Sequence, residues 1–164
     1  MPLESSFVMS GLGTPLLEGS ISAPTVREVG GPITQMVIRK DQDWQIDVNW
    51  EVHGTLITPP SSSSFPFSGE WIVRAFLESI GPGTEYELPL GGAGARISVA
   101  TFTEPVPNPV PNERDYTTTI SVAANTVEPG VYKMAVAVTH ETSPGHPGPI
   151  AGFFEGGMLQ IYEP

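Results

Sequence analysis

One stretch, DWQIDVNWEVHG at residues 43–54, constrains the fold more than any other part of the chain. Its apolar and polar side chains alternate without exception over ten positions, and two of the apolar ones are tryptophans. Successive side chains of a β-strand point to opposite faces, so the pattern places every apolar side chain on one face. At the roughly 100° per residue of a helix, the same set would spread around more than half of the cylinder. The stretch is therefore predicted to be a central strand that faces the core.

Seven other segments have the composition and spacing of strands. They are rich in Val, Ile, Thr and aromatic residues, they are bounded by clusters of Gly, Pro and Ser, and none has a helical apolar stripe. The sequence thus predicts an all-β fold, an antiparallel two-sheet sandwich of about 7–8 strands. Besides 43–54, the predicted strands are residues 33–40, 69–81, 85–88, 95–102, 115–124, 131–140 and 156–163.

The domain organisation follows from where this periodicity begins. Residues 1–32 show little of it and are predicted to form an extended N-terminal arm, whereas residues 33–164 are predicted to form a single β-sandwich domain. Two connections are long. Residues 58–67 are rich in Ser and Pro, and residues 103–114 carry a proline at every second position, which predicts a stiff polyproline-like connector along a sheet edge. Recognition of that segment by an aromatic groove is the alternative.

The charge balance excludes several classes of partner. The chain carries 18 acidic and 7 basic residues, a net charge of −11, and the basic residues are scattered. Nucleic acid and anionic membrane surfaces both require clustered cations, so neither is a predicted partner. The absence of cysteine excludes disulfides, thiolate metal sites and cysteine nucleophiles. The sequence shows neither a signal peptide nor an apolar span, which favours the cytoplasm or a larger particle without fixing the compartment.

The segment NTVEPGVYKMAVAVTH, residues 125–140, resembles the E–F corner and F strand of immunoglobulin-like and fibronectin-III-like sandwiches. It has a Pro-Gly turn, a tyrosine shortly afterwards, and then an alternation of apolar residues. The resemblance lies at the level of the fold and covers roughly residues 33 to 162. It implies that Tyr132 closes the corner by a hydrogen bond to nearby backbone, and that the C, F and G strands are neighbours in one sheet.

This arrangement predicts an apolar patch on the outward face of that sheet. Residues 70–79 are apolar on both faces, and large apolar patches are rarely left wet on monomers. The patch is expected to be covered by the N-terminal arm, by the 58–67 loop with Phe65 and Phe67, or by another protein or a second copy. The predicted interaction face consists of Ile72, Arg74, Phe76, Ala135, Ala137, Met158 and Tyr162.

Motifs for catalysis or cofactor binding are weak. None of the three histidines lies in a nucleophile signature, so an enzyme is not predicted. His140, Glu141 and His146 are the one candidate metal set, but their spacing favours an ordinary strand end and loop, and no metal or cofactor is predicted. The glycine-rich residues 88–98 are predicted to form a turn, because a strand rather than a helix follows them.

These observations predict a non-catalytic interaction or assembly module that docks onto itself or onto a larger protein assembly through the outward apolar face. The alternative is a carbohydrate-binding or adhesive module, because β-sandwiches often present loops or flat faces to glycans. That alternative needs exposed aromatic side chains. All three tryptophans fall on faces predicted to be buried, which leaves Tyr86, Phe65 and Phe67 as candidates.

Overall fold

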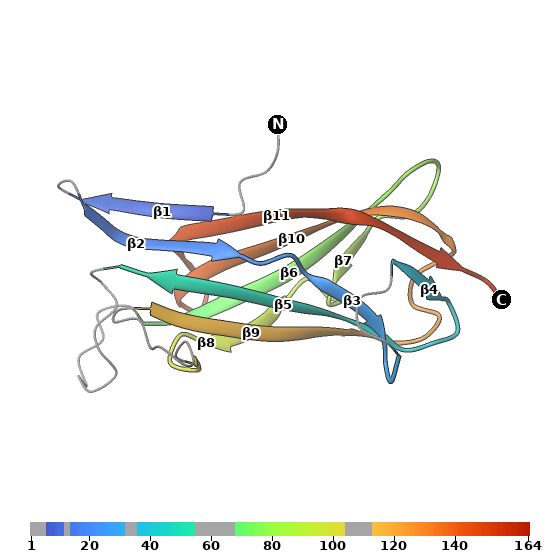
Figure 1. Ribbon diagram of the computed structural model, residues 1–164, viewed down its shortest axis with the longest axis horizontal. Helices are drawn as coiled ribbons and strands as arrows, with labels where there is room; N and C mark the ends of the chain where they lie inside the picture. Colours follow the sequence, from blue (N-terminus) through green and yellow to red (C-terminus); the bar gives the residue numbers. More distant parts are fainter. Residues whose placement is uncertain (1–5, 12–13, 32–35, 55–67, 104–112) are drawn as a thin grey trace.

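The computed structural model describes residues 6–11, 14–31, 36–54, 68–103 and 113–164. In this part of the chain all regular elements are strands, and they form two sheets that pack face to face (Figure 1). The all-β sandwich predicted from the sequence is confirmed. The strands are β1 (Ser6–Gly11), β2 (Thr14–Ile21), β3 (Thr25–Glu28), β4 (Val37–Arg39), β5 (Trp44–His53), β6 (Glu70–Ser79), β7 (Tyr86–Leu88), β8 (Ala95–Ser98), β9 (Glu113–Val122), β10 (Gly130–Ser143) and β11 (His146–Tyr162).

The first sheet is organised around β5, the strand with the strict alternation. β9 pairs with it along its whole length, from Trp44 opposite Val122 to His53 opposite Glu113. The other edge of β5 is shared by β2 and β3, which pair with its two halves, and β1 extends the sheet beyond β2. Pro24 lies between β2 and β3, where its missing N–H interrupts no ladder.

The described part of the expected N-terminal arm therefore lies within the first sheet. Its strands contribute Leu17, Ile21 and Val26 to the buried core, each at most 3% exposed. Hydrogen bonding to β5 fixes the position of β2 and β3. The three buried side chains then pack at the edge of the core near Trp44 and Trp50.

The second sheet has β10 at its centre, between β6 and β11. This is the neighbour relation that the resemblance implied for the C, F and G strands. β4 adds to β11 as a parallel strand, and the free edge of β6 is shared by β8 and β7. Of the described strands, eight occupy predicted positions, while β1 to β3 were not predicted and β10 and β11 run further into their hairpin than expected.

An aromatic layer joins the two sheets. Trp50 and Tyr116 stack with ring centroids 5.4 Å apart, and Trp71 from the second sheet meets both edge-on, at 6.1 and 5.6 Å. All three side chains are at most 3% exposed. The hydroxyl of Tyr116 donates a hydrogen bond to the carbonyl of Val99 at 2.7 Å, so its polar atom is satisfied inside the core.

The corner before β10 has the geometry that the sequence suggested. The buried hydroxyl of Tyr132 donates a hydrogen bond to the carbonyl oxygen of Glu128 at 2.8 Å, and this bond closes the turn. Burial raises the pKa of the Tyr132 phenol, so the hydroxyl stays a donor. The hydroxyl of Tyr86 accepts a hydrogen bond from the N–H of Glu128 at 3.1 Å, which ties β7 to the same corner.

Two expected loops fall largely beyond the described residues. The Ser/Pro-rich loop at 58–67, with Phe65 and Phe67, lies outside them, as does most of the connector at 103–114. Among the described residues, no helix is long and apolar enough to cross a membrane.

Candidate functional site

Strand alternation builds the outward face of the second sheet. Trp71, Val73 and Ala75 of β6 belong to the core, so Ile72, Arg74 and Phe76 point to the opposite side. Cross-strand pairing with β10 then places Ala135 opposite Phe76 and Ala137 opposite Arg74 on that face. The face assignment made from the sequence is the one in the structure.

Strand register aligns exposed apolar side chains across this face. Val37 of β4 pairs with Gln160 of β11, and Gln160 pairs with Val131 of β10. The N–H of Ile80, just after β6, donates a hydrogen bond to the carbonyl of Val131 at 2.8 Å. Val37, Val131 and Ile80 are all exposed, and we call these three residues the apolar row.

Two further apolar side chains on β11 extend the apolar row. Met158 lies opposite Lys133 of β10 and is 61% exposed, and Tyr162 lies opposite Arg39 of β4 and is 36% exposed. Phe76, which is 38% exposed, lies further along β6. The sequence analysis found Met158, Tyr162 and Phe76. It missed the apolar row, because Val37 and Ile80 lie at the margins of their strands and only the register places them on one line with Val131, with Gln160 between Val37 and Val131.

The predicted patch is smaller than expected because the chain covers part of it. Ile72 is only 2% exposed although it points outward, because the backbone at Gly94 lies against its side chain. Ala137 is also buried. Arg74 pairs with Glu87 at 3.0 Å and donates a hydrogen bond to the carbonyl of Gly92, so this part of the face is polar.

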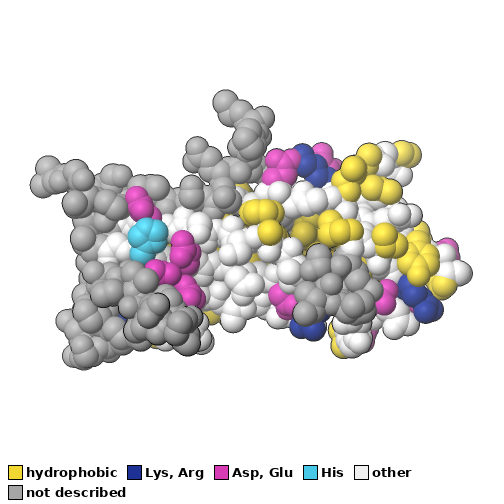
Figure 2. Space-filling view, viewed as in Figure 1, with side chains coloured by type: hydrophobic (Ala, Val, Ile, Leu, Met, Phe, Trp, Pro, Cys, Tyr) yellow, Lys and Arg dark blue, Asp and Glu magenta, His cyan; other side chains and the backbone are white. Residues whose placement is uncertain are grey.

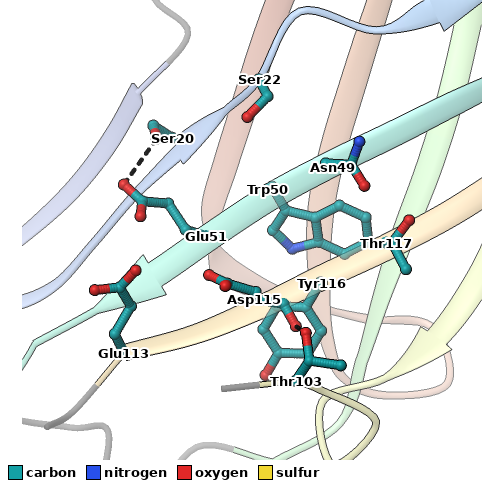
Figure 3. A pocket seen from close by; sticks show the side chains of 10 residues that line it. All are labelled: Ser20, Ser22, Asn49, Trp50, Glu51, Thr103, Glu113, Asp115, Tyr116 and Thr117. Atoms are coloured by element: carbon teal, nitrogen blue, oxygen red, sulfur yellow. Dashed lines mark hydrogen bonds between the residues drawn. The ribbon is translucent and has the colours of Figure 1, made fainter. Parts of the chain in front are cut away.

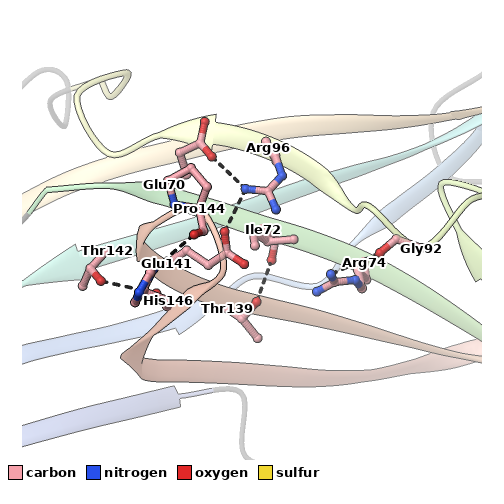
Figure 4. Close-up of polar contacts among 10 residues, drawn as sticks. All are labelled: Glu70, Ile72, Arg74, Gly92, Arg96, Thr139, Glu141, Thr142, Pro144 and His146. Carbon is pink, nitrogen blue, oxygen red and sulfur yellow. Dashed lines mark hydrogen bonds and ion pairs between the residues drawn. The ribbon is translucent and has the colours of Figure 1, made fainter.

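The candidate metal set is not brought together. β10 continues to Ser143, so the alternation turns His140 into the core and Glu141 outward. His140 packs on Trp71 and its Nε2 atom lies 2.8 Å from the carbonyl of Ser68, whereas Glu141 binds Arg96 at 2.9 Å. His146 lies in the exposed hairpin, where its Nδ1 atom is 3.1 Å from the Pro144 carbonyl (Figure 4). Burial lowers the pKa of His140, which keeps its imidazole neutral.

A groove on the outer face of the first sheet was not predicted. It has a volume of about 600 Å³ and lies over β2, β5 and β9. Hydroxyl, amide and carboxylate groups dominate its lining, which comes from β2, β5, β9 and Thr103 (Figure 3). The lining residues are Ser20, Ser22, Asn49, Trp50, Glu51, Thr103, Glu113, Asp115, Tyr116 and Thr117.

Three carboxylates crowd one side of this groove. Oxygens of Glu51, Glu113 and Asp115 lie within 4.8 Å of one another, and Ser20 donates a hydrogen bond to Glu51 at 3.0 Å. Acidic side chains gather around a histidine at the end of the molecule where β5 ends (Figure 2). His53, which pairs with Glu18 at 2.9 Å, contributes a favourable charge interaction with Glu113 when it is protonated.

Two carboxyl groups of this cluster have raised pKa values. Burial, together with a hydrogen bond and charge repulsion from Glu51, raises the pKa of Glu113. Burial and the charge of Glu51 likewise raise the pKa of Asp115. This cluster could not be predicted from the sequence, because the pairing of β5 with β9 creates it by placing Glu51 opposite Asp115 and His53 opposite Glu113.

The raised pKa of Glu113 predicts a pH-dependent stability. The folded state holds this proton more tightly than the unfolded state, so the Glu113 contribution to stability rises as the pH falls from neutral through the raised pKa. Glu113→Gln is expected to stabilise the protein by about 0.5–1 kcal/mol at neutral pH and to have little effect below pH 4.5, the ordinary pKa to which this carboxyl returns in the unfolded chain. Urea unfolding of the wild type and the variant across the pH range measures this difference.

The difference between the stability curves of the wild type and of Glu113→Gln gives the contribution of Glu113 alone. Buried His140, whose lowered pKa makes stability fall as the pH drops below its ordinary value of 6.5, acts equally in both proteins. Glu85→Gln, which removes an exposed carboxylate elsewhere, is the matched control for the loss of one negative charge. Parallel curves for wild type and Glu113→Gln would contradict the prediction.

Comparisons with known proteins give no family. No family model matches the chain, and no curated protein matches it. Among solved structures, the fold is similar to the crystal structure of the C-terminal domain of Wzt, with 13% identity, a TM-score of 0.47, and coverage of 100% of this chain and 81% of that one. It is also similar to a β-glucosidase from Listeria innocua in complex with glucose, with 12% identity, a TM-score of 0.41, and coverage of 90% and 17%. At these values the two likenesses assign neither a family nor a function, and the chain is described by its fold, an all-β sandwich of two sheets.

Proposed function

We propose that this chain is a non-catalytic binding module that docks on another protein through the outward face of its second sheet. The observation that carries the proposal is the apolar row with Met158 and Tyr162 beside it, a set of exposed apolar side chains that register makes adjacent. Monomeric proteins seldom leave such patches in contact with water unless the patch has a function.

The positions of the histidines support a binding role over acid–base catalysis. His53 pairs with Glu18 at the end of β5, His140 is buried against Trp71, and His146 lies in the β10–β11 hairpin. The three imidazoles therefore belong to three separate environments. An acid–base mechanism needs a general base within hydrogen-bond reach of the group it activates.

Site-specific photo-crosslinking tests the proposal. A benzophenone amino acid replaces Met158 in one protein and Val29, which is equally exposed but follows β3 of the first sheet, in the other. Both are irradiated in an extract of the cells that make the protein, and adducts are identified by mass spectrometry. The expected result is a protein adduct at position 158 that is absent at position 29 and is lost in a Val131→Asp background. Identical adducts at both positions, or no adduct at position 158, would contradict the proposal.

Glycan binding in the groove of the first sheet is a second candidate. The specific observation in its favour is the polar lining, because Asn49, Thr117 and the nearby carboxylates offer the donors and acceptors that sugar hydroxyls need. The groove lacks an exposed aromatic platform among its described lining residues, since Trp50 and Tyr116 are buried. A glycan array separates the candidates: hits that Asn49→Ala removes support sugar binding, and an array without hits eliminates it.

A further inference from the structure

The cationic side chains of this chain already have partners within the same molecule. All seven Lys and Arg residues lie in the described part of the chain, and six of them form ion pairs with carboxylates of the same molecule. The seventh, Arg114, is 5% exposed, and its guanidinium lies 3.9 Å from the centre of the Phe102 ring. Carboxylates, by contrast, are in large excess, with a net charge of −11.

Part of this excess negative charge lies next to Phe76 on the outward face of the second sheet. A groove of about 470 Å³ lies over β6 and the start of β7 and is lined by Phe76, Leu77, Glu78, Glu85, Tyr86 and Glu87. Glu78 and Glu85 are exposed and have no ion-pair partner among the described residues, whereas Glu87 pairs with Arg74. Lys133 lies opposite Glu78 in register, but its ammonium group pairs with Glu155.

This combination of groups selects a cation. Carboxylates bind ammonium and guanidinium groups by charge-assisted hydrogen bonds, and the face of an aromatic ring attracts the same groups electrostatically. Phe76 presents a partly exposed ring beside the two carboxylates. The apolar row lies on the same face, so an occupant of both regions needs apolar side chains next to its positive charges.

We infer that the partner of the second sheet is a basic protein segment, in which Lys or Arg enters the Phe76–Glu78–Glu85 groove and neighbouring apolar side chains cover the apolar row. The inference rests on the proposed docking function and specifies its partner. A second copy of this chain does not meet the requirement, because its own cations are engaged and its net charge of −11 opposes the approach. The partner is therefore a different, positively charged protein.

Peptide titrations followed by amide NMR test the inference on the full chain. The probes are acetyl-Arg-Trp-Arg-amide and its acidic counterpart acetyl-Glu-Trp-Glu-amide. The basic peptide is expected to shift the amide resonances of Phe76, Glu78 and Glu85 and those of the apolar row, and the acidic peptide none of them. The double variant Glu78→Gln/Glu85→Gln is expected to weaken binding of the basic peptide about five-fold, the order expected when two exposed charge contacts are lost.

A matched variant distinguishes specific binding of the basic peptide in this groove from its general attraction to an acidic protein. Glu51→Gln/Glu113→Gln removes the same charge from the groove of the first sheet and is expected to leave the affinity nearly unchanged. An equal loss in both double variants, or equal shifts with the acidic peptide, would overturn the inference. If the adduct at position 158 proves to be an acidic protein, the inference falls and the docking function stands. If the peptides behave as expected but no protein is crosslinked, the docking function falls and the cation site remains.

Discussion

Replacing Trp71 with alanine is expected to lower the free energy of unfolding by about 3–5 kcal/mol, because the truncation leaves a cavity that the surrounding core fills only in part. The side chain is fully buried and contacts Trp50, Tyr116 and His140, with ring centroids 5.4–6.1 Å away. It is also the ring from the second sheet in the aromatic layer, so its loss removes the contacts of that sheet with Trp50 and Tyr116. Domains are typically stable by only about 5–15 kcal/mol, which makes this a large fraction of the total.

Urea unfolding followed by far-ultraviolet circular dichroism measures the loss without depending on tryptophan fluorescence. Met158→Ala is the control, because the side chain is 61% exposed and its truncation is expected to change stability by less than about 0.5 kcal/mol. A loss at Trp71 no larger than that at Met158 would show that the aromatic layer does not hold the sheets together.

Gly69→Ala is expected to be comparably damaging, for a reason that lies in the backbone. Gly69 immediately precedes β6 and has a φ of +110°, a conformation that residues with a Cβ atom rarely adopt. A Cβ there would overlap the carbonyl oxygen of Glu141 on β10, which cannot move without breaking the pairing of the two strands. Strain and overlap together are expected to cost about 2–6 kcal/mol.

Gly81→Ala provides a control with nearly the same backbone conformation. Its φ is +118°, but no atom lies within 4 Å of the position that a Cβ would take. Only the strain is then incurred, about 1–3 kcal/mol. Thermal unfolding of both variants gives the difference, which measures the overlap with Glu141. Equal losses of stability would show that the backbone of β10 moves aside at Glu141, so that the overlap with a Cβ at position 69 costs nothing.

The strands with strong alternation could be predicted from the sequence because their signal is local. In β5 every second residue is buried, so the pattern alone fixes both the strand and its inward face. The same holds for β6, whose assignment placed Phe76 outward and Trp71 inward. The Pro-Gly turn before Tyr132 likewise carries its own signal, because the hydrogen-bond partner, Glu128, is only four residues away.

What the sequence could not provide is the relation between strands. The carboxylate cluster exists because Glu51 and Asp115 are opposite each other in register, and the apolar row exists because β4 pairs with β11. Neither relation is visible in the pattern of a single strand. β2 and β3 were missed for a related reason: each covers only half of β5, so they bury few apolar side chains and show little periodicity. His140 and Glu141 face opposite sides because β10 continues past them to Ser143 and its side chains alternate.

The parallel pairing of β4 with β11 sets an order on folding during synthesis. β4 pairs with a strand that ends at Tyr162, so one edge of the second sheet stays open until almost the entire described chain has left the ribosome. Long-range contacts of this kind close slowly, because the intervening chain must first be brought together. Until that moment Ile38, which is buried in the finished protein, lacks its partner strand. The nascent chain thus passes through a period of exposed apolar surface, during which a chaperone or a neighbouring chain would find its easiest access.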